Sequence, residues 1–272
     1  MDSFMVKKLL LSLFFLSCSL SFAKDKELRV VQVSPSPESN TIVLRLIFPR
    51  PYENKRKNPV NVQMRIEGFP LGTMTQNDRA GQIFNDPDGQ SIHVIIDNEP
   101  YLAFHQAVED SFDENREFYD KIMSFAIPFN LKPGQHVIRA FPARSYGESL
   151  KGDGCFAAEI FYFQDRKKTD NLEVDLKKPY LTYNEPQGRY PLHESDPILL
   201  DFFLTNCELS PDGYKVRLYI DGKLSRTLTT WAPYYLYGLP KGIHQIKLEL
   251  IDQNDKLVPG YFNVVQREII IQ

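Results

Sequence analysis

One β unit occurs twice in this chain, and the repetition constrains the fold more than any other feature. The clearer copy reads RLYIDGKL and then PYYLYGLPKGIHQIKLELID within residues 217–252. A looser copy reads HVIIDNEPY and then FAIPFNLKPGQHVIRAFP between His93 and Pro142. Each contains a strand, an Ile-Asp turn, further strands, and a His that follows a Gly and opens the last strand. Two copies of one β unit predict two similar β domains in tandem.

Strands are also predicted by the spacing of apolar residues. TIVLRLIF places Ile42, Leu44 and Leu46 on one face, and HQIKLELID alternates apolar Ile246 and Leu248 with polar neighbours. This period of two is typical of half-buried strands. Nothing in the sequence alternates strands with long helices, which argues against a parallel α/β fold. We therefore expect antiparallel β-sandwiches.

The domain boundaries follow from composition. We expect a first domain over residues 24–164, opening with the strand ELRVVQV, and a second over residues 180–272. Between them, the charged, glycine-free segment 165–179 is a linker or an edge strand. The first copy also carries an insertion near 98–122, where apolar residues recur every four positions, beginning at Phe104. Such spacing fits a short helix or an ordered loop.

The N-terminus has the form of a secretory signal peptide. A pair of lysines precedes the apolar run LLLSLFFLSCSL, and Ser-Phe-Ala ends at Ala23. We predict a signal peptide over residues 1–23 and an exported protein, periplasmic or secreted. No later apolar run reaches the roughly eighteen residues of a membrane helix. An alternative is lipidation at Cys18, although Phe15 and Leu16 depart from the usual lipoprotein pattern.

Charge and motif content argue against several classes of function. The net charge of −3 gives no electrostatic reason to expect nucleic acid as a partner. No Gly-rich phosphate loop and no Cys-x-x-Cys pair occur, and the acidic residues between Glu109 and Asp120 lack EF-hand spacing. We therefore expect no cofactor, no metal and no catalytic residues.

Two cysteines, Cys155 and Cys207, follow the signal peptide, one in each expected domain. Export permits a disulfide between them, which would staple the domains together. Alternatively each is a separate buried thiol that packs as a small apolar side chain. We favour separate thiols.

The second domain resembles bacterial immunoglobulin-like modules. The resemblance is carried by LYIDG at 218–222, Pro233-Tyr234, Gly242-Ile243-His244 and LELID at 248–252. The antibody-type Cys–Trp–Cys pattern is absent, and the first domain departs further because Asn98 replaces the turn glycine. The resemblance implies two tandem immunoglobulin-like β-sandwiches. It also implies an accessory, spacer or adhesion-type module, often attached to secreted glycan-active proteins, with no catalytic residues.

The most polar loop of the chain, RAFPARSYGESLKGDG at 139–154, is the first candidate binding site. Loops on rigid sandwiches often carry recognition. Arg144 is suited to clamp a carboxylate or phosphate, and Tyr146 to stack on a sugar ring, with Glu148 and Lys151 beside them. The alternative is a salt-bridged loop that folds back on its own domain.

Aromatic residues around the only tryptophan form the second candidate site. Trp231 and Tyr234 are its tentative ligand-binding members, and Tyr235 and Tyr237 continue the band. Aromatic faces bind sugars and peptides. Because side chains alternate along a strand, we also expect one set of this band to enter the core.

His136 and His244 occupy the same place in the two copies. A metal ligand or a catalytic base is one interpretation of such residues. We favour a structural one, in which each His packs and hydrogen-bonds at a turn, because two repeats of a fold have no reason to repeat an active site.

These observations favour a non-catalytic exported protein that recognises a polymer, such as a glycan, or an envelope protein, or acts as a spacer. One alternative is a hydrolase acting on a glycan or an ester in the first domain. That activity needs an acidic residue of the insertion within about 5–10 Å of Glu148. The other alternative is subunit binding by addition of a strand to a free sheet edge.

Overall fold

The computed structural model describes residues 27–38, 41–107, 121–166, 174–192 and 197–272. The expected signal peptide, its cleavage site at Ala23 and Cys18 lie outside these residues. The described chain is built of β-strands, with one 3-10 turn, η1 (Asp78–Gly81). It contains no helix of the length and apolarity needed to cross a membrane.

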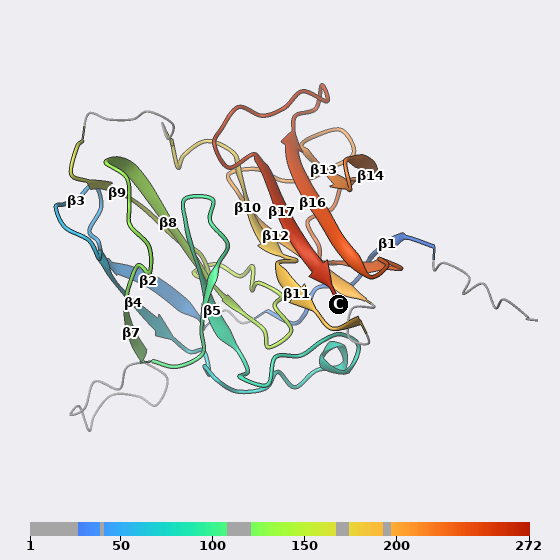
Figure 1. Ribbon diagram of the computed structural model, residues 1–272, viewed down its shortest axis with the longest axis horizontal. Helices are drawn as coiled ribbons and strands as arrows, with labels where there is room; N and C mark the ends of the chain where they lie inside the picture. The colour runs from blue at the N-terminus through green and yellow to red at the C-terminus, as the bar shows by residue number, and fades with distance from the viewer. Residues whose placement is uncertain (1–26, 39–40, 108–120, 167–173, 193–196) are drawn as a thin grey trace, which may run out of the picture.

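The first half of the chain forms a β-sandwich (Figure 1). One sheet has three strands, in the order β2 (Val43–Phe48), β4 (Asn61–Glu67) and β7 (Lys121–Ala126). The facing sheet has five, in the order β3 (Asn54–Lys55), β9 (Ala157–Phe163), β8 (Gly134–Ala143), β5 (Ser91–Ile96) and β6 (Leu102–Phe104).

A second sandwich follows. Its four-stranded sheet has the order β1 (Arg29–Gln32), β15 (Tyr234–Tyr237), β12 (Ile198–Thr205) and β10 (Tyr180–Glu185). Its five-stranded sheet has the order β11 (Gly188–Tyr190), β17 (Val264–Ile271), β16 (Gly242–Ile251), β13 (Lys215–Ile220) and β14 (Lys223–Leu228).

The two sandwiches repeat one topology. In each five-stranded sheet a short edge strand pairs in parallel with the last strand of the unit, and the remaining pairs are antiparallel. Each sandwich closes over its own apolar cluster, centred on residues such as Met64 and Ile138 in the first and Leu218 and Leu248 in the second. The all-β fold of two immunoglobulin-like antiparallel sandwiches is therefore confirmed.

The first strand belongs to the second sandwich, not to the first as the sequence order indicated. β1 runs antiparallel to β15, with Arg29 opposite Tyr237 and Gln32 opposite Tyr234. Val30 packs against the core of the second sandwich, which holds the strand there. The chain then crosses to the first sandwich through residues 33–38.

The expected insertion differs from a helix where the structure describes it. Residues 102–104 form β6, which pairs with β5, and the Phe104 ring lies 4.3 Å from that of Phe125. Residues 108–120, which carry the rest of the predicted helical face, lie outside the described residues. In the expected linker, residues 174–179 form no strand, and Val174 and Leu176 pack near Tyr180.

Cys155 is buried, Cys207 is half-buried, and both are free thiols. The favoured prediction of two separate thiols is confirmed. Burial raises the pKa of each thiol to about 11, so neither is a reactive thiolate at neutral pH.

Candidate functional site

The two repeated histidines make the same hydrogen bonds. His136 Nδ1 lies 2.7 Å from Asp97 Oδ2 and its Nε2 lies 2.7 Å from the Lys132 carbonyl oxygen. His244 Nδ1 lies 2.8 Å from Asp221 Oδ2 and its Nε2 lies 2.8 Å from the Pro240 carbonyl oxygen. Both ring nitrogens of each His are engaged, so these residues fasten turns and neither offers a free nitrogen to a ligand.

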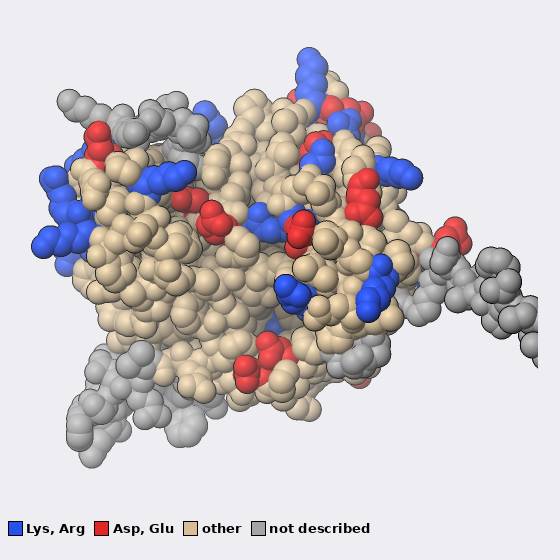
Figure 2. All heavy atoms as spheres, in the orientation of Figure 1, with Lys and Arg blue, Asp and Glu red and all other residues tan. Residues whose placement is uncertain are grey.

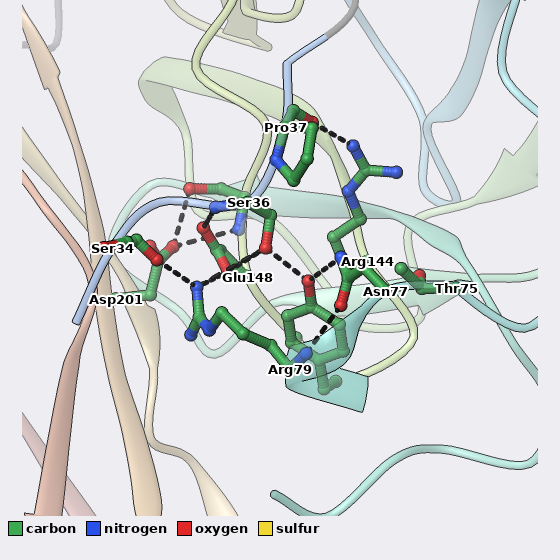
Figure 3. Close-up of polar contacts among 12 residues, drawn as sticks. Ser34, Ser36, Pro37, Thr75, Asn77, Arg79, Arg144, Glu148 and Asp201 are labelled. Atoms are coloured by element: carbon green, nitrogen blue, oxygen red, sulfur yellow. Dashed lines mark hydrogen bonds and ion pairs between the residues drawn. The ribbon is translucent and has the colours of Figure 1, made fainter. Parts of the chain in front are cut away.

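The 139–154 loop, whose residues 139–143 are the end of β8, lies in the seam between the sandwiches, where Glu148 and Lys151 form ion pairs (Figure 3). Glu148 is buried and forms an ion pair with Arg79. It also accepts hydrogen bonds from the Ser36 amide at 2.9 Å and the Ser36 hydroxyl at 2.8 Å. Arg79 reaches the second sandwich as well, because its Nε donates to the Tyr235 hydroxyl at 3.1 Å.

Local sequence explains how Arg79 is presented. Asn77 caps η1, with its side-chain oxygen accepting from the backbone amides of Arg79 and Ala80 at 3.0 and 3.2 Å. Its amide nitrogen donates to the Tyr146 hydroxyl at 2.8 Å. The cap therefore ties η1 to the 139–154 loop and directs Arg79 toward Glu148.

Lys151 forms a second buried pair across the seam. Its ammonium group lies 2.7 Å from Asp201 Oδ1, on β12 of the second sandwich. The other oxygen of Asp201 accepts from the Ser149 hydroxyl at 2.6 Å and from the Asn184 side chain at 2.7 Å. Lys151 is therefore committed to a structural contact.

The polar face of this loop holds the chain's own segment 33–38. The Ser36 hydroxyl contacts the Tyr146 hydroxyl, and Arg144 donates to the Pro37 carbonyl oxygen. The backbone amides of Lys151 and Gly152 both donate to Glu38 at 3.1 Å. The segment thus occupies much of the polar face of the loop, in the manner of the salt-bridged loop given as the alternative, although Arg144 and Tyr146 also line a cavity.

The aromatic band is not an exposed platform. Tyr234 is 1% exposed, lies in the core of the second sandwich and donates its hydroxyl proton to the Thr230 carbonyl oxygen at 2.8 Å. Trp231 is half-buried and donates to the Phe202 carbonyl oxygen at 2.9 Å. Tyr235 is also buried, since it contacts Arg79 at the seam. The side chains on both faces of β15 are therefore buried or half-buried, whereas the sequence predicted that only one face would enter the core.

A pocket of about 150 Å³ does open between the sandwiches, and Arg144 and Tyr146 line it. Thus two of the six predicted ligand-binding residues reach a common cavity, and the other four do not line it. The remaining walls of the pocket come from both halves of the chain. Its polar and aromatic lining residues include Phe84, Asp86, His93, Tyr101, His105, Glu185, Gln187, Arg189 and Tyr190, and Ala103 lies among them.

Glu185, at the end of β10, is the central polar group of this pocket. It accepts hydrogen bonds from the hydroxyls of Tyr101 at 2.5 Å and Tyr190 at 3.0 Å, and from the Gln187 amide at 3.1 Å. Its side chain sits tightly against Gly147, where a Cβ atom would lie 2.8 Å from Glu185 Oε1. Burial raises the pKa of Glu185 to about 7 despite these donors.

His93 lines the same pocket and is linked to Glu185 through Tyr101. Its ring stacks on Tyr101 with 3.7 Å between centroids, and its Nδ1 lies 2.7 Å from Asn184 Oδ1. The Asn184 amide nitrogen donates to the Gly147 carbonyl oxygen, so Asn184 Oδ1 is an acceptor and His93 Nδ1 is the donor. Burial lowers the pKa of His93 to about 4, which keeps the ring neutral at neutral pH.

Sequence reasoning missed Glu185, His93, Tyr101 and Tyr190. Of these, only His93 could have been noticed in the sequence, because it is the one polar residue in the otherwise apolar run IHVII. The others come together through packing of the two sandwiches, which no spacing in the sequence encodes. Across the described residues, no group of three or more His, Cys, Asp or Glu side chains is arranged to hold a metal ion.

Comparisons with known proteins add a likeness of fold. No family model matches the chain, and no curated protein matches its sequence. The fibronectin(III)-like modules of Clostridium thermocellum CbhA are similar in structure, with 9% identity, a TM-score of 0.28, and coverage of 85% of this chain and 94% of theirs.

Two other solved structures show a similar degree of likeness. Dimeric latent PorU from Porphyromonas gingivalis has 13% identity and a TM-score of 0.28 over 85% of this chain, which spans only 20% of PorU. The central fibronectin-III array of RIM-binding protein has 10% identity and a TM-score of 0.24, over 88% of this chain and 69% of that one. The fold assignment rests on the strand order, because TM-scores this low carry no further argument.

Proposed function

We propose that this protein is a non-catalytic exported recognition protein that binds a small chemical group in the pocket between its sandwiches. The observation that carries the proposal is the convergence of buried polar groups and aromatic rings from both sandwiches on one cavity. Concave sites with apolar walls and a few fixed polar groups, placed between domains, are the usual form of a binding site.

The seam gives such a site the rigidity that recognition needs. Two buried ion pairs, Arg79–Glu148 and Lys151–Asp201, hold the 139–154 loop, one of them directly to the second sandwich. Because each charge is paired and further hydrogen-bonded, the pocket walls are fixed before a ligand arrives. Pre-organisation of this kind lowers the entropic cost of binding.

The size of the pocket limits its occupant. A cavity of about 150 Å³ is smaller than the roughly 300–1,000 Å³ that hold drug-sized ligands. A terminal unit of a glycan or a single side group of an envelope protein is therefore the kind of partner we propose. On the face shown in Figure 2, basic and acidic side chains both occur, and we propose no nucleic-acid partner.

The hydrolase alternative is less well supported. Its paired carboxylates would come from the acidic residues of the insertion, which lie outside the described residues, and from Glu148. The Glu148 carboxylate is buried and ion-paired to Arg79, which leaves it poorly placed to transfer a proton to a substrate.

A binding screen with a blocked pocket tests the proposal. Ala103 is exposed and lines the pocket from β6, so Ala103→Trp is expected to fill it without disturbing a core. Ala126→Trp, at an exposed position on β7 away from the pocket, is the matched control. We expect a ligand from a glycan array or envelope extract to bind the native protein and the control, and to be lost in Ala103→Trp. Equal binding to all three would place recognition elsewhere.

One observation favours a second candidate function, binding by strand addition. The edge of β15 already accepts β1, whereas its counterpart in the first sandwich, β7, pairs only with β4 within the described residues. The Ile127 amide donates to the Val60 carbonyl oxygen on the β4 side. Because amide directions alternate along a strand, the amides of residues 126, 124 and 122 point away from β4 and toward the free edge. A partner lost in Ser124→Pro but retained in Ala103→Trp would favour this function.

A further inference from the structure

The described residues contain three buried carboxylates, all at the seam, and they differ in how their charge is balanced. Glu148 has Arg79 and Asp201 has Lys151, each as a buried ion pair. Glu185 has only neutral donors, two tyrosine hydroxyls and a backbone amide. A buried carboxylate without a counter-ion is costly, because hydrogen bonds replace only part of the lost hydration.

The arginines that border the pocket do not supply the missing charge. Arg144 donates to the Pro37 carbonyl oxygen and, at 3.2 Å, to Gln90 Oε1. Arg189 donates to Gln272 Oε1 at 3.2 Å. Neither guanidinium group bonds to Glu185, and His93 is held neutral by burial.

A second carboxylate, Asp86, adds to the negative field of the pocket. Asp86 Oδ2 lies 3.9 Å from His105 Nε2, and Asp86 Oδ1 accepts a hydrogen bond from the Asp88 amide at 2.9 Å. Burial raises the pKa of Tyr101 well above its usual value, and the charges of Glu185 and Asp86 raise it further. Glu185 and Asp86 thus both act on the Tyr101 hydroxyl at the pocket wall, in addition to its burial.

The apolar part of the wall is aromatic. Tyr101 and Tyr190 flank Glu185, and Phe84, which is 42% exposed, lies at the same cavity. Aromatic faces attract cations through the ring quadrupole, and the attraction strengthens where water is excluded. Cages of aromatic rings are a known means of binding alkylated ammonium groups.

We propose that the seam pocket binds a small organic cation, an alkylated ammonium group, with Glu185 as its counter-ion and Phe84, Tyr101 and Tyr190 as its aromatic wall. The inference rests on the proposed function, since it names the ligand class of the same pocket. The cation would supply the charge that Glu185 lacks, as Arg79 and Lys151 do for the other two carboxylates. A neutral sugar would leave this charge unbalanced.

Calorimetric titration of the full chain with choline and with its neutral isostere 3,3-dimethylbutan-1-ol, at pH 8, tests the proposal. The two molecules have almost the same shape and differ in charge. We expect choline to bind, and the isostere to bind at least tenfold more weakly. Glu185→Gln should lower the affinity for choline at least tenfold, whereas Glu208→Gln, which changes an exposed carboxylate, should leave it unchanged.

Ala103→Trp provides the second variant and should abolish choline binding by filling the pocket, even if Glu185→Gln does not fold. Equal affinity for choline and the isostere, or choline binding that survives Ala103→Trp, would overturn the proposal. Binding of a neutral glycan that Ala103→Trp abolishes, without choline binding, would overturn the cation class and leave the proposed function intact. Failure of every ligand to bind would overturn both.

Discussion

At the scale of single residues, the partner of each buried carboxylate decides what that carboxylate can do. Glu148 and Asp201 are neutralised by cations of the same chain and act as fasteners of the seam. Glu185 is surrounded by neutral donors and faces a cavity, so its charge is available to a ligand and its protonation is sensitive to pH. Three residues of the same chemical type thus divide into two roles through packing alone.

Replacing Glu185 by Gln should change how stability depends on pH. Its folded pKa of about 7 lies above its ordinary value of 4.5, so the folded state holds this proton more tightly than the unfolded state. Stability from this group is therefore full below about pH 4.5 and decreases as pH rises toward 7, by at most about 3 kcal/mol. The groups that act on it most closely are Tyr101, Tyr190 and Asp201.

The measurement is urea unfolding of the native protein and of Glu185→Gln at pH 4.5, 6 and 8. We expect the free energy of unfolding of the variant, relative to native, to increase with pH across this range. A constant difference between the two proteins would mean that Glu185 is not buried as described.

Glu148→Ala should destabilise the protein by about 3–5 kcal/mol, because it leaves the Arg79 guanidinium buried without its counter-ion. Glu208→Ala, at an exposed carboxylate, should change stability by no more than about 0.5 kcal/mol. Urea unfolding at pH 7 compares them. A Glu148→Ala variant of native stability that had lost only ligand binding would restore the sequence-based interpretation of Glu148 as a recognition residue.

At the scale of elements, the repeated Asp–His turn shows how the two sandwiches share a design. Asp97 and Asp221 both have positive φ, of 54° and 50°. Each uses one oxygen for the His and the other for a backbone amide, that of Val137 at 2.9 Å or Gln245 at 2.8 Å. The turn therefore joins two neighbouring strands of the five-stranded sheet in the same way in both copies.

Substitution by Ala should cost more at Asp97 than at Asp221. The Asp97 side chain is 15% exposed and that of Asp221 is 48% exposed, so water replaces the lost bonds more readily at Asp221. We expect losses of about 2–3 kcal/mol for Asp97→Ala and about 1 kcal/mol for Asp221→Ala. Chemical unfolding of both variants measures this, and the reverse order would show that burial does not set the cost.

The sequence was sufficient for the strands and the repeat, because period-two alternation and the IleAsp…GlyxHis pattern are local. It was insufficient for β1, since four residues of alternating strand carry no information about which sheet they join. It left open whether Glu148 and Lys151 bind a ligand or belong to a salt-bridged loop, because only the packing of residues 33–38 and β12 against the loop shows their ion pairs. The pocket could not be predicted from the sequence, since Tyr101 and Glu185 meet only when the two sandwiches pack together.

At the scale of the whole molecule, the two sandwiches are joined by the path of the chain and by buried side-chain contacts. β1 completes a sheet of the second sandwich, and residues 33–38 then lie along the seam before β2 begins the first. Arg139, on β8, adds a buried contact: it donates to Thr182 Oγ1 at 2.9 Å and stacks 3.7 Å from the Phe262 ring. The second sandwich therefore includes a strand from the start of the chain, and the seam joins both sandwiches through buried polar contacts.

This arrangement predicts that the two sandwiches unfold together. Trp231, the only tryptophan, reports on the second sandwich, whereas far-UV circular dichroism reports on both. We expect the two signals to give one coincident urea transition, because loss of either sandwich exposes the paired charges of the seam. Separate transitions in the native protein would contradict this.

Arg139→Leu should separate the two signals. It removes the guanidinium group that lies over the Phe262 ring, and it leaves the buried Thr182 hydroxyl without the donor that Arg139 supplies. Arg45→Leu, at an exposed position on β2, is the control and should retain one transition. If the sandwiches part in Arg139→Leu, the pocket they share should be lost before either core unfolds, because its walls come from both. Ligand binding should then fail at a lower urea concentration than Trp231 fluorescence changes, which ties recognition to the seam and not to either sandwich alone.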